Sequence, residues 1–170
     1  MSAPGDIRGG VAEPAAAPPR GAAPVGLIDE LPPAEAAAIL YFRLWCDGPS
    51  GRARIHADLC SRLGPAEADL AAGVFDALMA TVLSGMRRPL MRHGTECRCF
   101  GGDESAFANM VAAALSDEIE DAMIFAAALM RGAPALDAAV LAGRLRPAFP
   151  RAPGWQTDAG PAAAAPFTRH

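Results

Sequence analysis

Residues 65–85 read PAEADLAAGVFDALMATVLSG and carry the clearest helical pattern in the chain. Four apolar residues recur at every fourth position and two more widen their stripe: Leu70, Val74, Leu78, Val82, Phe75 and Met79. This spacing places them on one face of an α-helix. We therefore predict a helix over residues 65–85 that forms the spine of an apolar core.

The segments on either side of this helix predict further, shorter helices. They are expected over residues 32–46, 51–63, 103–115, 116–131 and 134–146, several of them opening on proline, which is tolerated in a first helical turn. Asp103 and Ser116 are the expected caps of the fourth and fifth helices. The predicted fold class is all-α, a compact bundle of about five to six short helices over residues 31–146.

The two ends of the chain differ from this helical part. Residues 1–30 repeat Pro and Gly among Ala, and residues 147–170 are rich in Pro and Ala, with Trp155 and Phe167 as isolated aromatics. Such segments bury too little apolar surface to offset the entropy of ordering. We predict a disordered N-terminal arm and an irregular C-terminal tail, with Leu27, Ile28 and Leu31 able to dock onto the domain.

Composition narrows the class of partner. The net charge is -4 at a pI of about 5.3, and all fifteen basic residues are Arg. An acidic chain of this kind has no overall field that would draw it onto nucleic acid or anionic lipid. No continuous apolar run approaches the roughly 18–20 residues that span a bilayer, and residues 1–26 lack the features of a secretory signal. We expect a cytoplasmic protein whose four cysteines are reduced.

Residues 86–102, MRRPLMRHGTECRCFGG, show no sustained periodicity and contain one Pro and three Gly. They therefore predict a loop of about seventeen residues, a length that usually indicates function or disorder. The loop carries four basic residues, Arg87, Arg88, Arg92 and Arg98. Their guanidinium groups could bind an acidic partner. Alternatively, Arg87 and Arg88 cap the preceding helix and pair with acidic residues at 117–121.

Histidine and cysteine form two similar pairs that suggest a metal site. His56 and Cys60 lie four residues apart on a predicted helix, so they share a face. The loop supplies His93, Cys97 and Cys99. Imidazole and thiolate are ligands that suit Zn²⁺, and a structural zinc ion would staple the loop. Zinc is thus the one possible cofactor that the sequence suggests.

The cysteines have two other interpretations. Cys46 and Cys60 lie beside apolar residues of predicted helices, where buried thiols are common. In the loop, Arg92, His93 and Arg98 flank Cys97 and Cys99, and nearby positive charge favours a reactive thiolate. Each of these alternatives stays open at this point.

Sequence motifs of catalysis are missing. The chain has no G-x-S-x-G, no phosphate-binding Gly-rich motif after a strand and no Glu-x-x-His pairs of the kind found in di-iron bundles. We therefore expect no enzyme.

The stretch Arg87-Arg88-Pro89-Leu90-Met91-Arg92-His93, followed by Cys97-Arg98-Cys99 and Asp103-Glu104, resembles short uncharacterised helical proteins encoded in GC-rich proteobacterial genomes. The likeness covers residues 32–131. It implies a compact helical domain and carries over no catalytic or binding residue.

Together these observations predict a non-enzymatic cytoplasmic helical protein that acts through protein contacts, as a regulator or adaptor. The loop 86–102 is the expected contact surface. The alternative is a small structural zinc protein that uses the His/Cys pairs. We expect the partner to be a protein rather than a membrane or a nucleic acid, and the sequence leaves the oligomeric state open.

Overall fold

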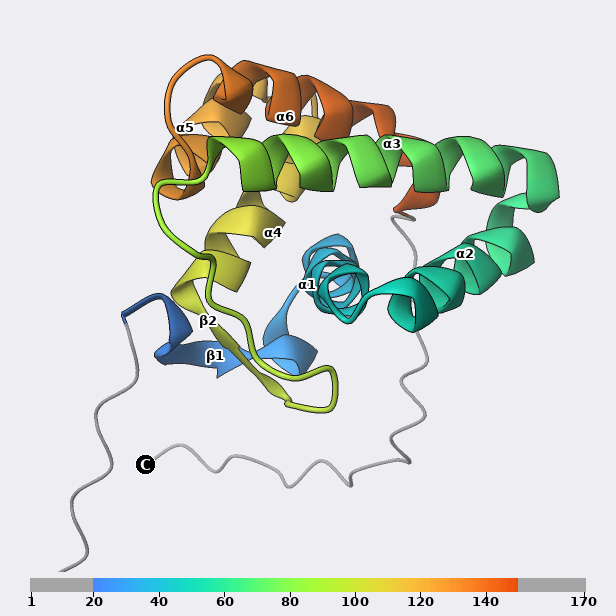
Figure 1. Cartoon of the computed structure of the whole chain (residues 1–170), viewed down its shortest axis with the longest axis horizontal. Helices are drawn as coiled ribbons and strands as arrows, with labels where there is room; N and C mark the ends of the chain where they lie inside the picture. The colour runs from blue at the N-terminus through green and yellow to red at the C-terminus, as the bar shows by residue number, and fades with distance from the viewer. Residues whose placement is uncertain (1–19, 150–170) are drawn as a thin grey trace, which may run out of the picture.

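The computed structural model describes residues 20–149, and within them the chain is an all-α bundle, as the sequence predicts (Figure 1). Six α-helices form it: α1 (Pro33–Cys46), α2 (Pro49–Leu63), α3 (Pro65–Gly85), α4 (Gly102–Leu115), α5 (Ile119–Leu129) and α6 (Pro134–Arg144). Two short strands, β1 (Pro24–Leu27) and β2 (Cys99–Gly101), and three 3-10 turns, η1 (Arg20–Ala22), η2 (Ile28–Glu30) and η3 (Arg146–Ala148), complete it. The bounds of α3 are those predicted from its apolar stripe.

Helix α3 runs along one side of the molecule, with α6 packed along it and α2 at its N-terminal end (Figure 1). Helix α4 packs against α1 on one side and against α5 and α6 on the other. Alanines are buried where α4, α5 and α6 meet, among them Ala114, Ala126 and Ala139. Their small side chains let the helix axes approach closely, since interaxial distance depends on the side chains at the contact.

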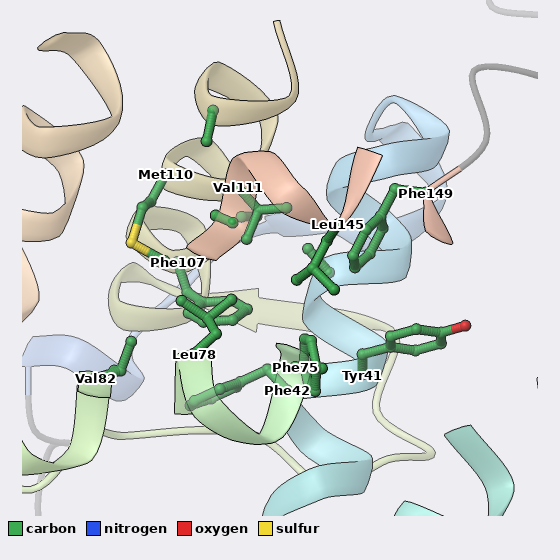
Figure 2. Close-up of a cluster of buried hydrophobic side chains, with 14 of the residues drawn as sticks. Tyr41, Phe42, Phe75, Leu78, Val82, Phe107, Met110, Val111, Leu145 and Phe149 are labelled. Carbon is green, nitrogen blue, oxygen red and sulfur yellow. The ribbon is translucent and has the colours of Figure 1, made fainter. Parts of the chain in front are cut away.

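An aromatic cluster forms the centre of the core (Figure 2). Phe107 of α4 is fully buried, with its ring centroid 5.0 Å from that of Phe42 on α1 and 6.5 Å from that of Phe75 on α3. Tyr41 packs edge-on against Phe75 at 5.6 Å. These tilted and edge-to-face contacts are the geometries that aromatic rings favour. The core therefore joins the first, third and fourth helices.

The residues predicted to cap the N-termini of the fourth and fifth helices do not do so. Asp103 lies inside the first turn of α4, where its carboxylate accepts hydrogen bonds from Arg88 and from the Met91 amide instead of capping the helix. Ser116 ends α4 rather than starting α5, and the residue before α5 is Glu118. Asp103 and Ser116 each marked the approximate position of a helix end, but neither is the residue that caps the helix predicted to start there.

The N-terminal boundary of the domain is earlier than predicted. Residues 20–30 belong to the fold rather than to the arm, because β1 pairs antiparallel with β2, with Leu27 opposite Cys99 and Gly26 opposite Phe100. Ile28 is buried, as expected of a docking side chain, whereas Leu27 is 41% exposed. A strand this short, whose partner lies in the loop 86–102, leaves no alternation for a sequence pattern to reveal.

The C-terminal boundary is later than predicted. Residues 147–149 continue the domain through η3, and Phe149 is buried with its ring centroid 5.4 Å from that of Tyr41. The remaining parts of the predicted arm and tail, residues 1–19 and 150–170 with Trp155 and Phe167, lie outside the described residues.

Helix α3 is long and apolar enough to cross a membrane by length and composition alone, with a mean hydropathy of 1.3 over the most apolar part of its 21 residues. The sequence has no continuous apolar run of roughly 18–20 residues, and we therefore did not predict a membrane-spanning helix. A core helix of a folded domain passes the same test, and α3 buries Phe75, Leu78 and Val82 in the core. Its hydropathy is therefore weak evidence of a membrane span.

Candidate functional site: a loop held by buried charges

Arg43 of α1 is fully buried, and all five of its N–H donors are used. Its Nε donates to Glu104 at 2.7 Å and its Nη2 to the other carboxylate oxygen at 3.1 Å. The remaining donors reach three backbone carbonyls of the loop, those of Gly94 at 3.0 Å, Cys97 at 2.6 Å and Cys99 at 2.6 Å. One side chain of the first helix thus fixes the path of the loop 86–102.

Glu104, in the first turn of α4, is the buried partner of Arg43. Besides the guanidinium, its carboxylate accepts from the His93 amide at 3.0 Å, from His93 Nδ1 at 2.8 Å and from the Gly101 amide at 2.8 Å. Burial by itself would raise the pKa of Glu104, but the hydrogen bonds from Arg43, His93 and Gly101 lower it below its ordinary value. The carboxylate is therefore charged at neutral pH.

This pair serves the shape of the loop more than the stability of the core. Removing two charges from water costs several kcal/mol per ion, so a buried salt bridge is weak evidence for stability by itself. Here the cost is offset by charge-assisted hydrogen bonds to loop carbonyls and amides, which an apolar pair in the same place would leave unmade. The pair therefore adds little net stability to the core, but its hydrogen bonds give the loop a defined conformation.

Asp103, the neighbour of Glu104, makes a second attachment. Its two carboxylate oxygens each accept from Arg88 at 2.7 Å, and one also accepts from the Met91 amide at 2.9 Å. Burial opposes the charge, but the Arg88 guanidinium and the Met91 amide hold the pKa of Asp103 below its ordinary value. Consecutive acidic residues at the start of α4 thus hold the two halves of the loop.

The four loop arginines, predicted as a docking patch, all contact other parts of the domain. Arg87 donates to the Met130 carbonyl at 3.0 Å, and Arg92 pairs with Asp47 at 2.9 Å. Arg88 pairs with Asp103, and Arg98 pairs with Asp29 at the surface. Pairing with residues 117–121, the alternative for Arg87 and Arg88, is not what the structure shows, because Arg87 binds the Met130 carbonyl and Arg88 binds Asp103. Arg98 is the most exposed of the loop arginines that form ion pairs, with 64% of its side chain accessible.

The five residues predicted as zinc ligands do not meet at one point. On α2, His56 binds Asp69 through Nε2 at 2.7 Å and lies 3.6 Å from the Cys60 sulfur. In the loop, His93 is bound to Glu104, and the Sγ atoms of Cys97 and Cys99 are 2.7 Å apart. Within residues 20–149, no three His, Cys, Asp or Glu side chains are grouped so that they could hold a metal ion.

Cys46 and Cys60 are half-buried and pack against the core, in line with the interpretation of both as core thiols. Burial raises the pKa of Cys46 despite the neighbouring Arg92. These thiols differ from those of the loop, where the two sulfurs contact each other.

The two residues that organise the site, Arg43 and Glu104, were not singled out from the sequence. The sequence did contain a sign of a buried charge, because Arg43 is the single charged residue in the run Ile39-Leu40-Tyr41-Phe42-Arg43-Leu44-Trp45, whose six remaining residues are apolar or aromatic. A charged residue in the buried stripe of a helix indicates a buried partner. Which residue is that partner could not be predicted, because Glu104 lies 61 positions away in the sequence and meets Arg43 only in the folded protein.

The fold and site define a small all-α protein with a long loop fixed by one buried ion pair, Arg43–Glu104, and by the partly exposed pair Arg88–Asp103. No protein-family model matches this chain, and neither a curated protein nor a solved structure is significantly similar to it. Its function must therefore be inferred from its own residues.

Proposed function

We propose that this protein acts without enzymatic activity, through contacts with another protein, and that the loop 86–102 together with β1 is the contact surface. The observation that carries the proposal is the Arg43–Glu104 pair, which holds a long polar loop in one conformation at the expense of two buried charges. A loop ordered in advance loses less entropy when it binds, which favours affinity. We further assign the protein to the cytoplasm, as a regulator or adaptor.

The surface beside the loop has the mixed character of an interface. Leu27 lies opposite Cys99 in the two-stranded sheet, so their side chains share a face, and Leu27 is 41% exposed. Val25 of the same strand is 58% exposed. Arg98 and Glu96 of the loop are also exposed, so this part of the domain presents both apolar and charged side chains to solvent, as protein interfaces do.

The test uses residues that reach solvent, because replacing Arg88 would break its attachment to Asp103 and so change the loop itself. The variant Leu27→Ser/Arg98→Glu removes one exposed apolar side chain and reverses one exposed charge. The matched control is Leu136→Ser/Arg146→Glu, since Leu136 is 47% exposed and Arg146 is also an exposed, ion-paired arginine. Helix α6, which carries Leu136, lies on the far side of the molecule from the sheet (Figure 1).

Wild type, variant and control are each used to capture partners from cells of the native host, with quantification by mass spectrometry. The proposal expects at least one specific partner that is retained by the wild type and the control and is depleted about tenfold or more by the loop variant, the effect of losing about 1.4 kcal/mol. Equal depletion by the control, or equal retention by both variants, would contradict this surface.

Zinc binding stays a prediction that the geometry does not favour, since the loop residues and the α2 pair are not gathered around one ion.

A further inference from the structure

The Cys97–Arg98–Cys99 segment places two thiols side by side. The chain bends at Arg98, directly before β2, and the Arg98 side chain pairs with Asp29. The two Sγ atoms are 2.7 Å apart, and both residues are half-buried rather than enclosed. This contact brings the sulfurs close to the roughly 2.05 Å length of a disulfide bond.

The buried arginine fixes the backbone of this pair. Arg43 donates to the carbonyls of both Cys97 and Cys99, each at 2.6 Å, and the Cys97 amide donates to the Gly94 carbonyl at 3.0 Å. Cys99 is also held by the strand pairing with Leu27. The two thiols are therefore placed by the fold as well as by their nearness in sequence.

We infer that Cys97 and Cys99 form a redox-active dithiol site that exchanges with disulfides, either low-molecular-weight ones or exposed disulfides of a partner. This inference is independent of the proposed contact function. In the first step the Cys97 thiolate attacks one sulfur of the disulfide R–S–S–R, forming a mixed disulfide and releasing RS⁻. In the second, the Cys99 thiolate attacks Cys97 Sγ and releases the second RS⁻. Two protein thiols are oxidised to one disulfide, and one disulfide is reduced to two RSH, which take up the two protons.

The surroundings of the two thiols favour one order of the two steps. The hydrogen bonds from the Cys99 thiol and amide lower the pKa of Cys97 below its ordinary value, with the Arg43 guanidinium contributing. The same contact raises the pKa of Cys99. We take Cys97 as the attacking thiol and Cys99 as the one that resolves the mixed disulfide, an assignment that the variants Cys97→Ser and Cys99→Ser test.

The test treats the reduced full-length protein with oxidised glutathione and follows each cysteine by alkylation and mass spectrometry. We expect an intramolecular Cys97–Cys99 disulfide, reversible by dithiothreitol, to form about tenfold faster than Cys46 or Cys60 reacts. In denaturant this advantage should become several-fold smaller, because only the nearness of the two residues in sequence then remains. Cys97 and Cys99 reacting no faster than the other two, or an advantage that is undiminished by unfolding, would overturn the inference.

Two single variants test the assigned roles. Cys99→Ser should accumulate a stable mixed disulfide on Cys97, because the resolving thiol is gone. Cys97→Ser should leave Cys99 reacting several-fold more slowly than Cys97 does in Cys99→Ser. Equal rates in the two variants would overturn the assignment of Cys97 as the attacking thiol.

Discussion

Arg43 on α1 and Glu104 on α4 form a two-pronged salt bridge in which neither side chain is exposed to solvent. Each of the two residues also binds backbone groups of the loop 86–102, Arg43 through three carbonyls and Glu104 through the amides of His93 and Gly101. The pair therefore links two helices of the bundle to a segment with little apolar burial of its own.

Glu104→Gln leaves the Arg43 charge buried without its counter-ion. We expect the free energy of unfolding to fall by about 3–5 kcal/mol, the usual cost of removing one partner of a buried pair. This loss of unfolding free energy is measured by urea denaturation, with circular dichroism as the signal. Glu67→Gln, at an exposed position of α3, is the control and should change stability by less than about 0.5 kcal/mol. Similar small losses for both variants would show that the buried charge is solvated in some other way.

Acid should destabilise the protein through the same carboxylates. Glu104 and Asp103 have pKa values below their ordinary 4.5 and 3.8 in the folded protein, so below about pH 4.5 the unfolded chain binds more protons than the folded one. Their contribution is complete at neutral pH and is lost as the pH falls through the folded-state values. Urea denaturation over a series from about pH 6 to about pH 3 should show a steep loss in the wild type and a shallower one in Glu104→Gln. Parallel curves would mean that Glu104 does not contribute to the acid sensitivity.

Phe149 tests the C-terminal boundary of the domain. Because its ring is buried against Tyr41, Phe149→Ala should lower stability by about 3 kcal/mol, a loss measurable as a lower Tm. The control Val140→Ala removes a side chain that is 48% exposed and should have little effect. A domain that ended at residue 146, as the sequence suggested, would tolerate both substitutions equally.

The helices were predictable and the loop attachments were not, for a physical reason. Residues 65–85 carry an apolar stripe that repeats along a single helix, so local spacing contains the information on the helix. The spacing did not show how far the stripe is buried, because Leu70 is 65% exposed whereas Leu78 and Val82 are fully buried. By contrast, the attachment of the loop joins Arg43 to Glu104, and β1 joins Leu27 to Cys99, in contacts that depend on how the helices pack. The partners of the histidines were unpredictable for the same reason, because His56 and His93 are each bound to a carboxylate that their own sequence neighbourhoods do not identify.

Metal removal distinguishes a loop held by zinc from a loop held by buried charges. With the loop held by Arg43, Glu104 and Asp103, treatment with a chelator should leave the Tm unchanged, and Cys97→Ser should have the same Tm with and without added Zn²⁺. A structural zinc ion would instead make the Tm fall on chelation and make Cys97→Ser insensitive to added metal while the wild type responds to it. Differential scanning calorimetry of both proteins, with metal content measured on the same samples, decides between the two.

Hydrogen exchange at the loop amides tests most directly whether the Arg43–Glu104 pair orders the proposed contact surface. In Arg43→Lys, which keeps the charge but cannot make the forked set of hydrogen bonds, we expect the amides of His93, Cys97 and Gly101 to exchange about tenfold faster or more. Amides in the middle of α3, away from the loop, should change only by the amount of the global loss of stability. If exchange at the loop amides accelerated in the variant only as much as exchange in the middle of α3, this result would contradict the claim that the buried pair holds the loop in place.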